Sequence, residues 1–97
     1  MIEIDKVLNT ILDDSIELPK VLVQGLTNNS SKVKKGFIFF AYKGDNYDGN
    51  EFIEDAFNNG ACLAISDSDK LESQKNVIKV DDVRTAAGIA CSNFYNF

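Results

Sequence analysis

Apolar and polar positions divide the chain into short segments with two different periods. In residues 5–12 the apolar side chains recur every three or four positions, which predicts a short amphipathic helix. A second segment with helical spacing follows Asp48, and a third covers about residues 82–95. Short apolar runs between these segments predict β-strands at residues 21–26, 37–42, 61–66 and 77–80.

Cap and turn residues indicate where the middle helix begins and ends. Asp48 has Glu51 three positions later, a spacing typical of a capping box, and Asn50 is a competing N-cap. Gly60 is well placed to take the left-handed conformation that ends a helix. Residues 27–35 show no helical pattern and are predicted to form a loop.

The order of these elements predicts an α/β fold. The run at 37–42 is apolar at both even and odd positions, as expected of a strand that helices cover on both faces. A right-handed crossover through a helix makes successive strands parallel. We therefore expect residues 1–97 to form one domain: a small, open, mostly parallel sheet with helices on its faces. Residues 67–76 are interpreted as a polar connection, with one helical turn near 70–73 as an alternative.

Composition and charge narrow the possible functions. The 97 residues carry a net charge of −5, which argues against general nucleic-acid binding because that requires a basic face. No run of apolar residues is long enough to span a membrane, and the N-terminal residues do not resemble a signal peptide. Cys62 and Cys91 lie in apolar segments and are expected to be buried, reduced thiols of a cytoplasmic monomer. The absence of His excludes His-based triads and makes a zinc site improbable.

Two polar loops, residues 27–36 and 43–50, carry the candidate binding chemistry. They follow the first two predicted strands, and ligands of open α/β sheets bind beyond the carboxyl ends of the strands. Their amides, hydroxyls and backbone N–H groups suit a base, a ribose or a diphosphate. The alternatives are that the first loop is capped by its own side chains and that the second is a tight turn. The first loop also contains three lysines, Lys32, Lys34 and Lys35. They either steer a diphosphate or form a solvated face.

The second loop resembles a nucleotide-triphosphate loop only in its glycines. Gly44 and Gly49 are five positions apart before a helix, but Asn50 and Glu51 stand where such a loop has Lys and Ser or Thr. Without that Lys, nothing in the loop reaches the β- and γ-phosphates. Acidic pairs elsewhere sit at element boundaries and suit caps better than catalysis. The residues alone therefore indicate a binding module without a complete active site, with no catalytic residue and no metal site.

The order of residues along the chain closely resembles that in the N-terminal domain of the Mur ligases. The matching positions are residues 27–30, 33–36, 38–41, 44, 48–49, 52–53, 56 and 60–61. These enzymes are ATP-dependent amide ligases that build the stem peptide of peptidoglycan. The resemblance covers about residues 25–95, most of the chain. The C-terminal part of the chain is similar to the MurE type of these ligases, in the segment from Val80 to Arg84 and in the pair Phe94 and Tyr95. MurE ligases add meso-diaminopimelate or L-lysine as the third residue of the stem peptide.

The resemblance implies that this domain binds the UDP moiety of UDP-N-acetylmuramoyl-L-alanyl-D-glutamate. The positions that match substrate contacts of the family are Asn28, Ser30, Asp45, Asn46 and Tyr47.

Three departures from the family pattern concern UDP affinity more than the fold. Asn29 and Phe37 each stand where the family usually has Asp, and Ser31 stands where it has Arg. The missing Arg removes a diphosphate or loop-ordering contact, and Lys32 is the candidate to replace it in part.

The resemblance also implies domains that these residues do not contain. A central domain would bind ATP and Mg²⁺ to activate the D-glutamyl carboxylate, and a C-terminal domain would help bind the incoming amino acid. The chain is therefore expected to be an isolated first domain that is inactive alone and works with the remaining domains in cis. The alternatives are the same domain of a MurF-type, D-alanyl-D-alanine-adding ligase, or a stand-alone nucleotide-binding or interaction module.

We predict that this chain does not bind Mg-ATP, because it has no Gly-Lys-Ser/Thr sequence and no paired magnesium ligands. Calorimetric titration with Mg-ATP should give no saturable heat. Micromolar binding would show that the interpretation of residues 44–49 is wrong.

Overall fold

A four-stranded parallel sheet forms the centre of the computed structural model. Its strands are β3 (Gly25–Thr27), β4 (Phe37–Ala41), β5 (Leu63–Ser66) and β6 (Val77–Lys79), in that spatial order. Every neighbouring pair is parallel, which confirms the predicted α/β class. β4 and β5 are the two inner strands, as their continuous apolar runs require.

The structure describes residues 1–12, 16–43, 48–68 and 76–95. The helical turn considered near residues 70–73, within the predicted connection 67–76, lies outside these ranges. The other elements are β1 (Ile2–Glu3), α1 (Ile4–Leu8), β2 (Leu22–Val23), the 3₁₀ helices η1 (Ser30–Lys32) and η2 (Gly49–Phe52), α2 (Ile53–Asn58) and α3 (Val83–Tyr95). None of the helices in the described ranges is long and apolar enough to cross a membrane.

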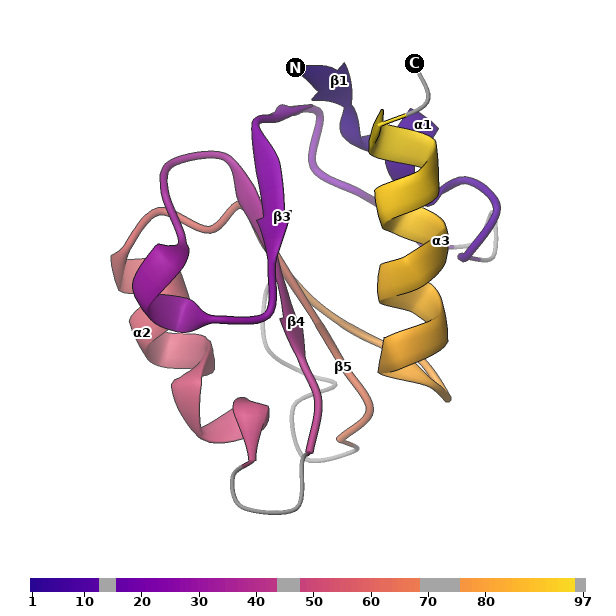
Figure 1. Ribbon diagram of the computed structural model, residues 1–97. Coiled ribbons are helices and arrows are strands. Elements are labelled where there is room, and N and C mark those ends of the chain that lie inside the picture. The colour runs from indigo at the N-terminus through magenta and orange to yellow at the C-terminus, as the bar shows by residue number, and fades with distance from the viewer. Residues whose placement is uncertain (13–15, 44–47, 69–75, 96–97) are drawn as a thin grey trace.

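Helices cover both faces of the sheet, with α2 on one side and α1 and α3 on the other (Figure 1). Alternate residues of β4 belong to different cores. Ile38 and Phe40 pack in the cluster that includes α1 and α3, whereas Phe39 and Ala41 pack in the cluster that includes α2. All four side chains are nearly inaccessible to solvent, which confirms that β4 is covered on both faces.

Residues 21–26 were predicted to form one continuous strand, and this prediction was wrong. The segment is divided into two short strands that belong to different sheets. β2 pairs antiparallel with β1, whereas β3 pairs parallel with β4. Gln24 lies between them and donates its N–H to the carbonyl of Gly36 at 2.9 Å. Because both halves satisfy the same apolar pattern, the sequence does not show that they have different partners.

Two further differences concern short helical segments. The first helix ends at Leu8 instead of Leu12, and Ile11 and Leu12 continue it only as a turn bonded to the Leu8 carbonyl. The predicted loop at 27–35 contains η1, whose N-cap Asn29 accepts a hydrogen bond from the Ser31 N–H. A single 3₁₀ turn has no apolar periodicity, so the pattern of residues could not reveal it.

The long final helix begins with a side-chain cap. Asp82 accepts hydrogen bonds from the N–H of Thr85 at 3.1 Å and from its hydroxyl at 2.9 Å. These bonds favour the ionised carboxylate and lower the pKa of Asp82. The acidic residue at this boundary is thus a cap, as predicted.

Gly60 ends α2 in the conformation expected from the sequence. Its φ is +113°, and the N–H of Ala61 donates to the carbonyl of Ala56 at 3.0 Å, as in a Schellman motif. A Cβ atom at Gly60 would lie 2.7 Å from the Cα atom of Lys35 and 2.8 Å from the backbone nitrogen of the same residue. The site therefore requires glycine both for its backbone angle and for the close approach of a second chain segment.

We predict that Gly60→Ala lowers the free energy of unfolding by about 1–3 kcal/mol, because it combines an unfavourable φ with a backbone clash. Gly88→Ala is the matched control, since a Cβ on Gly88 in α3 meets nothing within 4 Å. It should raise the free energy of unfolding by about 0.5–1 kcal/mol. Urea unfolding followed by circular dichroism measures both; equal effects would contradict the assignment of Gly60.

Candidate functional site

The two predicted polar loops start at the same edge of the sheet. β3 and β4 are parallel neighbours with Thr27 opposite Phe39, so their carboxyl ends lie next to each other. Asn28 follows β3 directly, and Tyr42 follows β4. Asp45, Asn46 and Tyr47 lie outside the described residues, and their predicted role stays a prediction.

The first loop is ordered largely by its own side chains, which was the structural alternative for this segment. The Thr27 hydroxyl accepts the N–H of Asn29 at 3.1 Å. The side-chain oxygen of Asn29 accepts the N–H of Ser31 at 3.0 Å and its hydroxyl at 2.7 Å. The side-chain amide of Asn59 donates to the carbonyl of Ser30 at 2.9 Å, which attaches the loop to the end of α2.

Two polar groups of this loop are not used in these internal contacts. No described residue makes a hydrogen bond to the Ser30 hydroxyl or to Oδ1 of Asn28. Nδ2 of Asn28 donates to the phenolic oxygen of Tyr42, which links the ends of β3 and β4. Asn28 is exposed and Ser30 is half-buried. Both predicted residues can therefore offer a donor or an acceptor to a ligand without losing a bond within the described residues.

Asn28 lines a cavity on each side of the sheet edge. The two cavities have similar sizes, about 360 Å³ on the α2 side and about 350 Å³ on the α3 side. The first is lined by Asn28, Asn29, Ser30, Phe39 and Phe52. The second is lined by Leu26, Thr27, Asn28, Phe40, Tyr42, Arg84, Ala87 and Cys91. Apolar walls with a few converging polar groups are typical of small-molecule sites.

Tyr42 and Arg84 line the cavity on the α3 side of Asn28, but the sequence interpretation did not select them. The guanidinium carbon of Arg84 lies 4.8 Å from the centroid of the Tyr42 ring, a cation–π contact. One signal was available for each: Tyr42 directly follows an apolar strand, and Arg84 is the single arginine of the chain. Their contact could not be inferred from the sequence, because residues 43–83 separate them.

The base of the second loop is fixed by a close approach and a short polar chain. The Gly49 N–H donates to the Tyr42 carbonyl at 3.0 Å, and a Cβ there would lie 2.8 Å from that oxygen. Asp48 accepts hydrogen bonds from the backbone and side chain of Asn50, which lower the pKa of Asp48. The fully buried Ser66 on β5 donates its hydroxyl to the Asn50 side-chain oxygen. Asp48 is therefore a cap, consistent with the tight-turn alternative.

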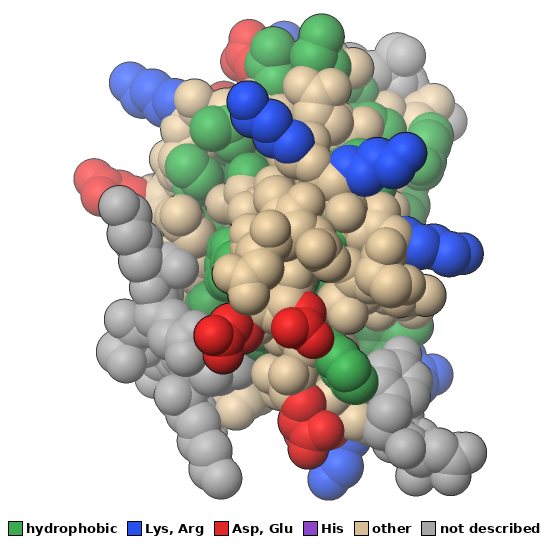
Figure 2. Space-filling view, turned by 90° about the vertical axis from the view of Figure 1, so that its left-hand side faces the viewer, with side chains coloured by type: hydrophobic (Ala, Val, Ile, Leu, Met, Phe, Trp, Pro, Cys, Tyr) green, Lys and Arg blue, Asp and Glu red, His purple; other side chains and the backbone are tan. Residues whose placement is uncertain are grey.

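The three lysines of the first loop are exposed, as expected of a solvated face. The backbone of Lys35 contacts Gly60 near the amino ends of β4 and β5, opposite the edge that carries Asn28. Figure 2 shows the same separation on the side covered by α2, where most cationic side chains lie in the upper half and a group of carboxylates lies below the centre. Lys34 and Lys35 are thus poorly placed to bind a diphosphate at the carboxyl edge.

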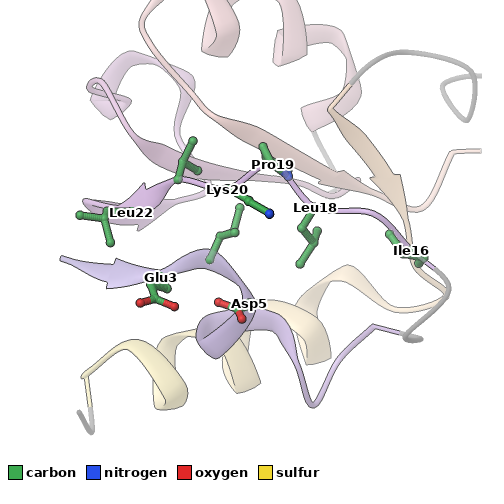
Figure 3. Close-up of a pocket in the computed structure, with 9 residues that line it drawn as sticks. Glu3, Asp5, Ile16, Leu18, Pro19, Lys20 and Leu22 are labelled. Carbon is green, nitrogen blue, oxygen red and sulfur yellow. The ribbon is translucent and has the colours of Figure 1, made fainter.

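A larger cavity of about 520 Å³ lies between the N-terminal elements and residues 16–22 (Figure 3). Its lining is aliphatic apart from the charged side chains of Glu3, Asp5 and Lys20. It shares no lining residue with the two cavities at Asn28. Its position makes it a useful negative control in the binding experiments below.

The cysteines and metal-ligating groups provide no additional site. Cys62 and Cys91 are free thiols, but both are half-buried instead of buried as the sequence indicated. Burial raises the pKa of the Cys62 thiol, so it stays protonated near neutral pH. Within the described ranges, no group of three or more His, Cys, Asp or Glu residues could hold a metal ion.

The described residues form a parallel α/β domain whose polar sheet edge lies between two cavities, the region of such sheets where ligands usually bind. The family model described as "Mur ligase family, catalytic domain" matches residues 22–95. The chain belongs to the Mur ligase family, which confirms the resemblance.

Individual relatives agree with this assignment. A UDP-N-acetylmuramoyl-L-alanyl-D-glutamate–2,6-diaminopimelate ligase of Rickettsia prowazekii is 47% identical over 73 residues, which cover 75% of this chain and 15% of the relative. The crystal structure of Thermotoga maritima MurF ligase in complex with ADP is 32% identical, with a TM-score of 0.62 over 77% of this chain and 18% of that chain. Acinetobacter baumannii MurF is 20% identical, with a TM-score of 0.75 over 91% and 20% of the two chains, and shows the fold alone. The chain thus spans about 15% of the length of this curated relative.

We predict that Ser66→Ala lowers the free energy of unfolding by about 1–3 kcal/mol, because it removes the buried hydroxyl that donates to the Asn50 side-chain oxygen and accepts the Ser68 N–H. Ser31→Ala removes an exposed hydroxyl and should change the free energy by no more than about 0.5 kcal/mol. Chemical denaturation of the variants measures both. Equal stability of Ser66→Ala and the wild type would refute a structural role for this contact.

Proposed function

We propose that this chain is the N-terminal domain of a ligase that adds a diamino acid to UDP-N-acetylmuramoyl-L-alanyl-D-glutamate in peptidoglycan synthesis, and that it binds the UDP moiety. The identity of 47% to a ligase of that name, in its N-terminal region, supports the enzyme class. ATP and Mg²⁺ would activate the acceptor carboxylate in another domain of the complete ligase. The residues of this chain would hold and orient the nucleotide end of the substrate.

The observation that carries the site assignment is the position of Asn28 and Ser30. They lie at the carboxyl end of β3, and each offers a polar atom that no described residue uses. The Ser30 hydroxyl can donate to a phosphate oxygen, and Oδ1 of Asn28 can accept a hydrogen bond from a uracil edge or a ribose. Asp45, Asn46 and Tyr47 are proposed to complete the site from the second loop.

A MurF-type ligase is the second candidate, because Thermotoga maritima MurF is 32% identical to this chain. The two candidates differ in the substrate of the complete enzyme and not in the nucleotide that this domain would bind. An assay of the full-length ligase separates them. The proposal expects a diamino acid to be consumed with UDP-N-acetylmuramoyl-dipeptide; consumption of D-alanyl-D-alanine with the corresponding tripeptide would favour the MurF type.

We predict that UDP-N-acetylmuramoyl-dipeptide shifts the amide resonances of residues 27–31 and 44–50 in an NMR titration of the labelled chain. Affinity should be weak, since the other domains that would hold the sugar and peptide are not in this chain. Ser30→Ala should weaken binding several-fold to about a hundredfold, because a hydrogen bond to a charged group is worth about 1.5–3 kcal/mol.

Ser31→Ala is the matched control for this experiment, because the Ser31 hydroxyl already donates to Asn29 in the same loop. It should leave the affinity nearly unchanged. Shifts that cluster at the large cavity of Figure 3, or no shifts at millimolar ligand, would show that the site is wrongly assigned. Equal losses in the two variants would exclude a direct contact by Ser30.

A further inference from the structure

Carboxylates lie on both sides of the carboxyl edge of the sheet, and the α3 side carries an arginine as well. On the α2 side, the first turns of η2 and α2 carry the carboxylates Glu51, Glu54 and Asp55. On the α3 side, the carboxylates Asp81 and Asp82 precede the helix, and the single arginine of the chain, Arg84, lines the same cavity as Asn28 and Tyr42. Among the two cavities at Asn28, the one on the α3 side therefore has a cation in its lining.

Three side chains from different elements form a continuous chain of contacts on that side. Arg84 lies near the start of α3, and its guanidinium covers the Tyr42 ring at 4.8 Å. The phenolic oxygen of Tyr42 accepts a hydrogen bond from Nδ2 of Asn28. Arg84 is thus connected, through Tyr42, to a residue of the proposed nucleotide site.

We propose that Arg84 is a positioning residue that acts through Tyr42 to hold Asn28 in its ligand-binding orientation. This inference rests on the proposed function and adds a residue from α3 that neither polar loop contains. The stacked guanidinium restricts the Tyr42 ring, and the fixed phenolic oxygen engages Nδ2 of Asn28. Oδ1 of Asn28 then stays available as an acceptor for a ligand N–H group, such as N3–H of uracil.

The test is a cycle of three variants: Arg84→Ala, Tyr42→Leu and the double variant. UDP is the probe, and its dissociation constant is measured by NMR titration of the labelled chain. Arg84→Ala should weaken UDP binding about two- to fivefold, the range expected from an exposed cation–π contact. The double variant should bind no more weakly than Tyr42→Leu alone, because the arginine acts only through the ring.

A spectroscopic signature separates positioning from a general loss of stability. The side-chain amide resonances of Asn28 in the free protein should shift in Arg84→Ala towards their values in Tyr42→Leu. Thermal melting should confirm that both variants are folded. Lys34→Ala is the matched control, since it removes the same charge from an exposed site near the opposite end of the sheet and should leave the affinity unchanged.

The outcomes distinguish this inference from the proposed function. If UDP causes no shift at Asn28 in the wild type, the proposed site is wrong. If the wild type binds there but Arg84→Ala has the same affinity, the positioning role is overturned. An equal loss from Arg84→Ala in the wild type and in the Tyr42→Leu background overturns it as well, because the arginine would then contact the ligand directly.

Discussion

Burial of β4 on both faces is the constraint on which the rest of the structure depends. Ile38 and Phe40 face one layer of helices, and Phe39 and Ala41 face the other. A strand with no solvated face must lie inside a sheet that is covered on both sides, which favours parallel pairing through helical crossovers. Parallel pairing in turn brings the carboxyl ends of β3 and β4 together, and the candidate site forms there.

Close backbone approaches fix both ends of this arrangement. At the amino end, Gly60 lets the end of α2 contact the backbone of Lys35 just before β4. At the carboxyl end, Gly49 lets the start of η2 lie against the Tyr42 carbonyl. Neither approach leaves space for a Cβ atom, so each glycine determines where a loop leaves the sheet. The buried Ser66 then secures the second loop to β5 through Asn50.

The candidate site combines a loop that is ordered internally with a few polar atoms left for a ligand. Thr27, Asn29 and Ser31 use their side chains to hold the loop, whereas Asn28 and Ser30 each keep a polar atom that no described residue binds. Such preorganisation lowers the entropy lost on binding. The chain belongs to the Mur ligase family, and Ser31 stands where the sequence resemblance led us to expect an arginine. Its single arginine lies on α3 instead, next to Tyr42.

The α/β class, the buried strands β4 and β5, the helix α3 and the caps at Gly60 and Asp82 could all be predicted from the amino-acid sequence. These features follow from apolar periodicity and cap chemistry, which act over a few neighbouring residues. The family was also readable, because the order of loop residues is specific.

Three features became visible only in the folded structure: residues 21–26 are divided between two sheets, Ser66 donates a hydrogen bond to Asn50, and Arg84 stacks on Tyr42. Each of these contacts joins residues that lie far apart in the chain. Their formation depends on how the layers pack, and no local pattern of residues records that packing.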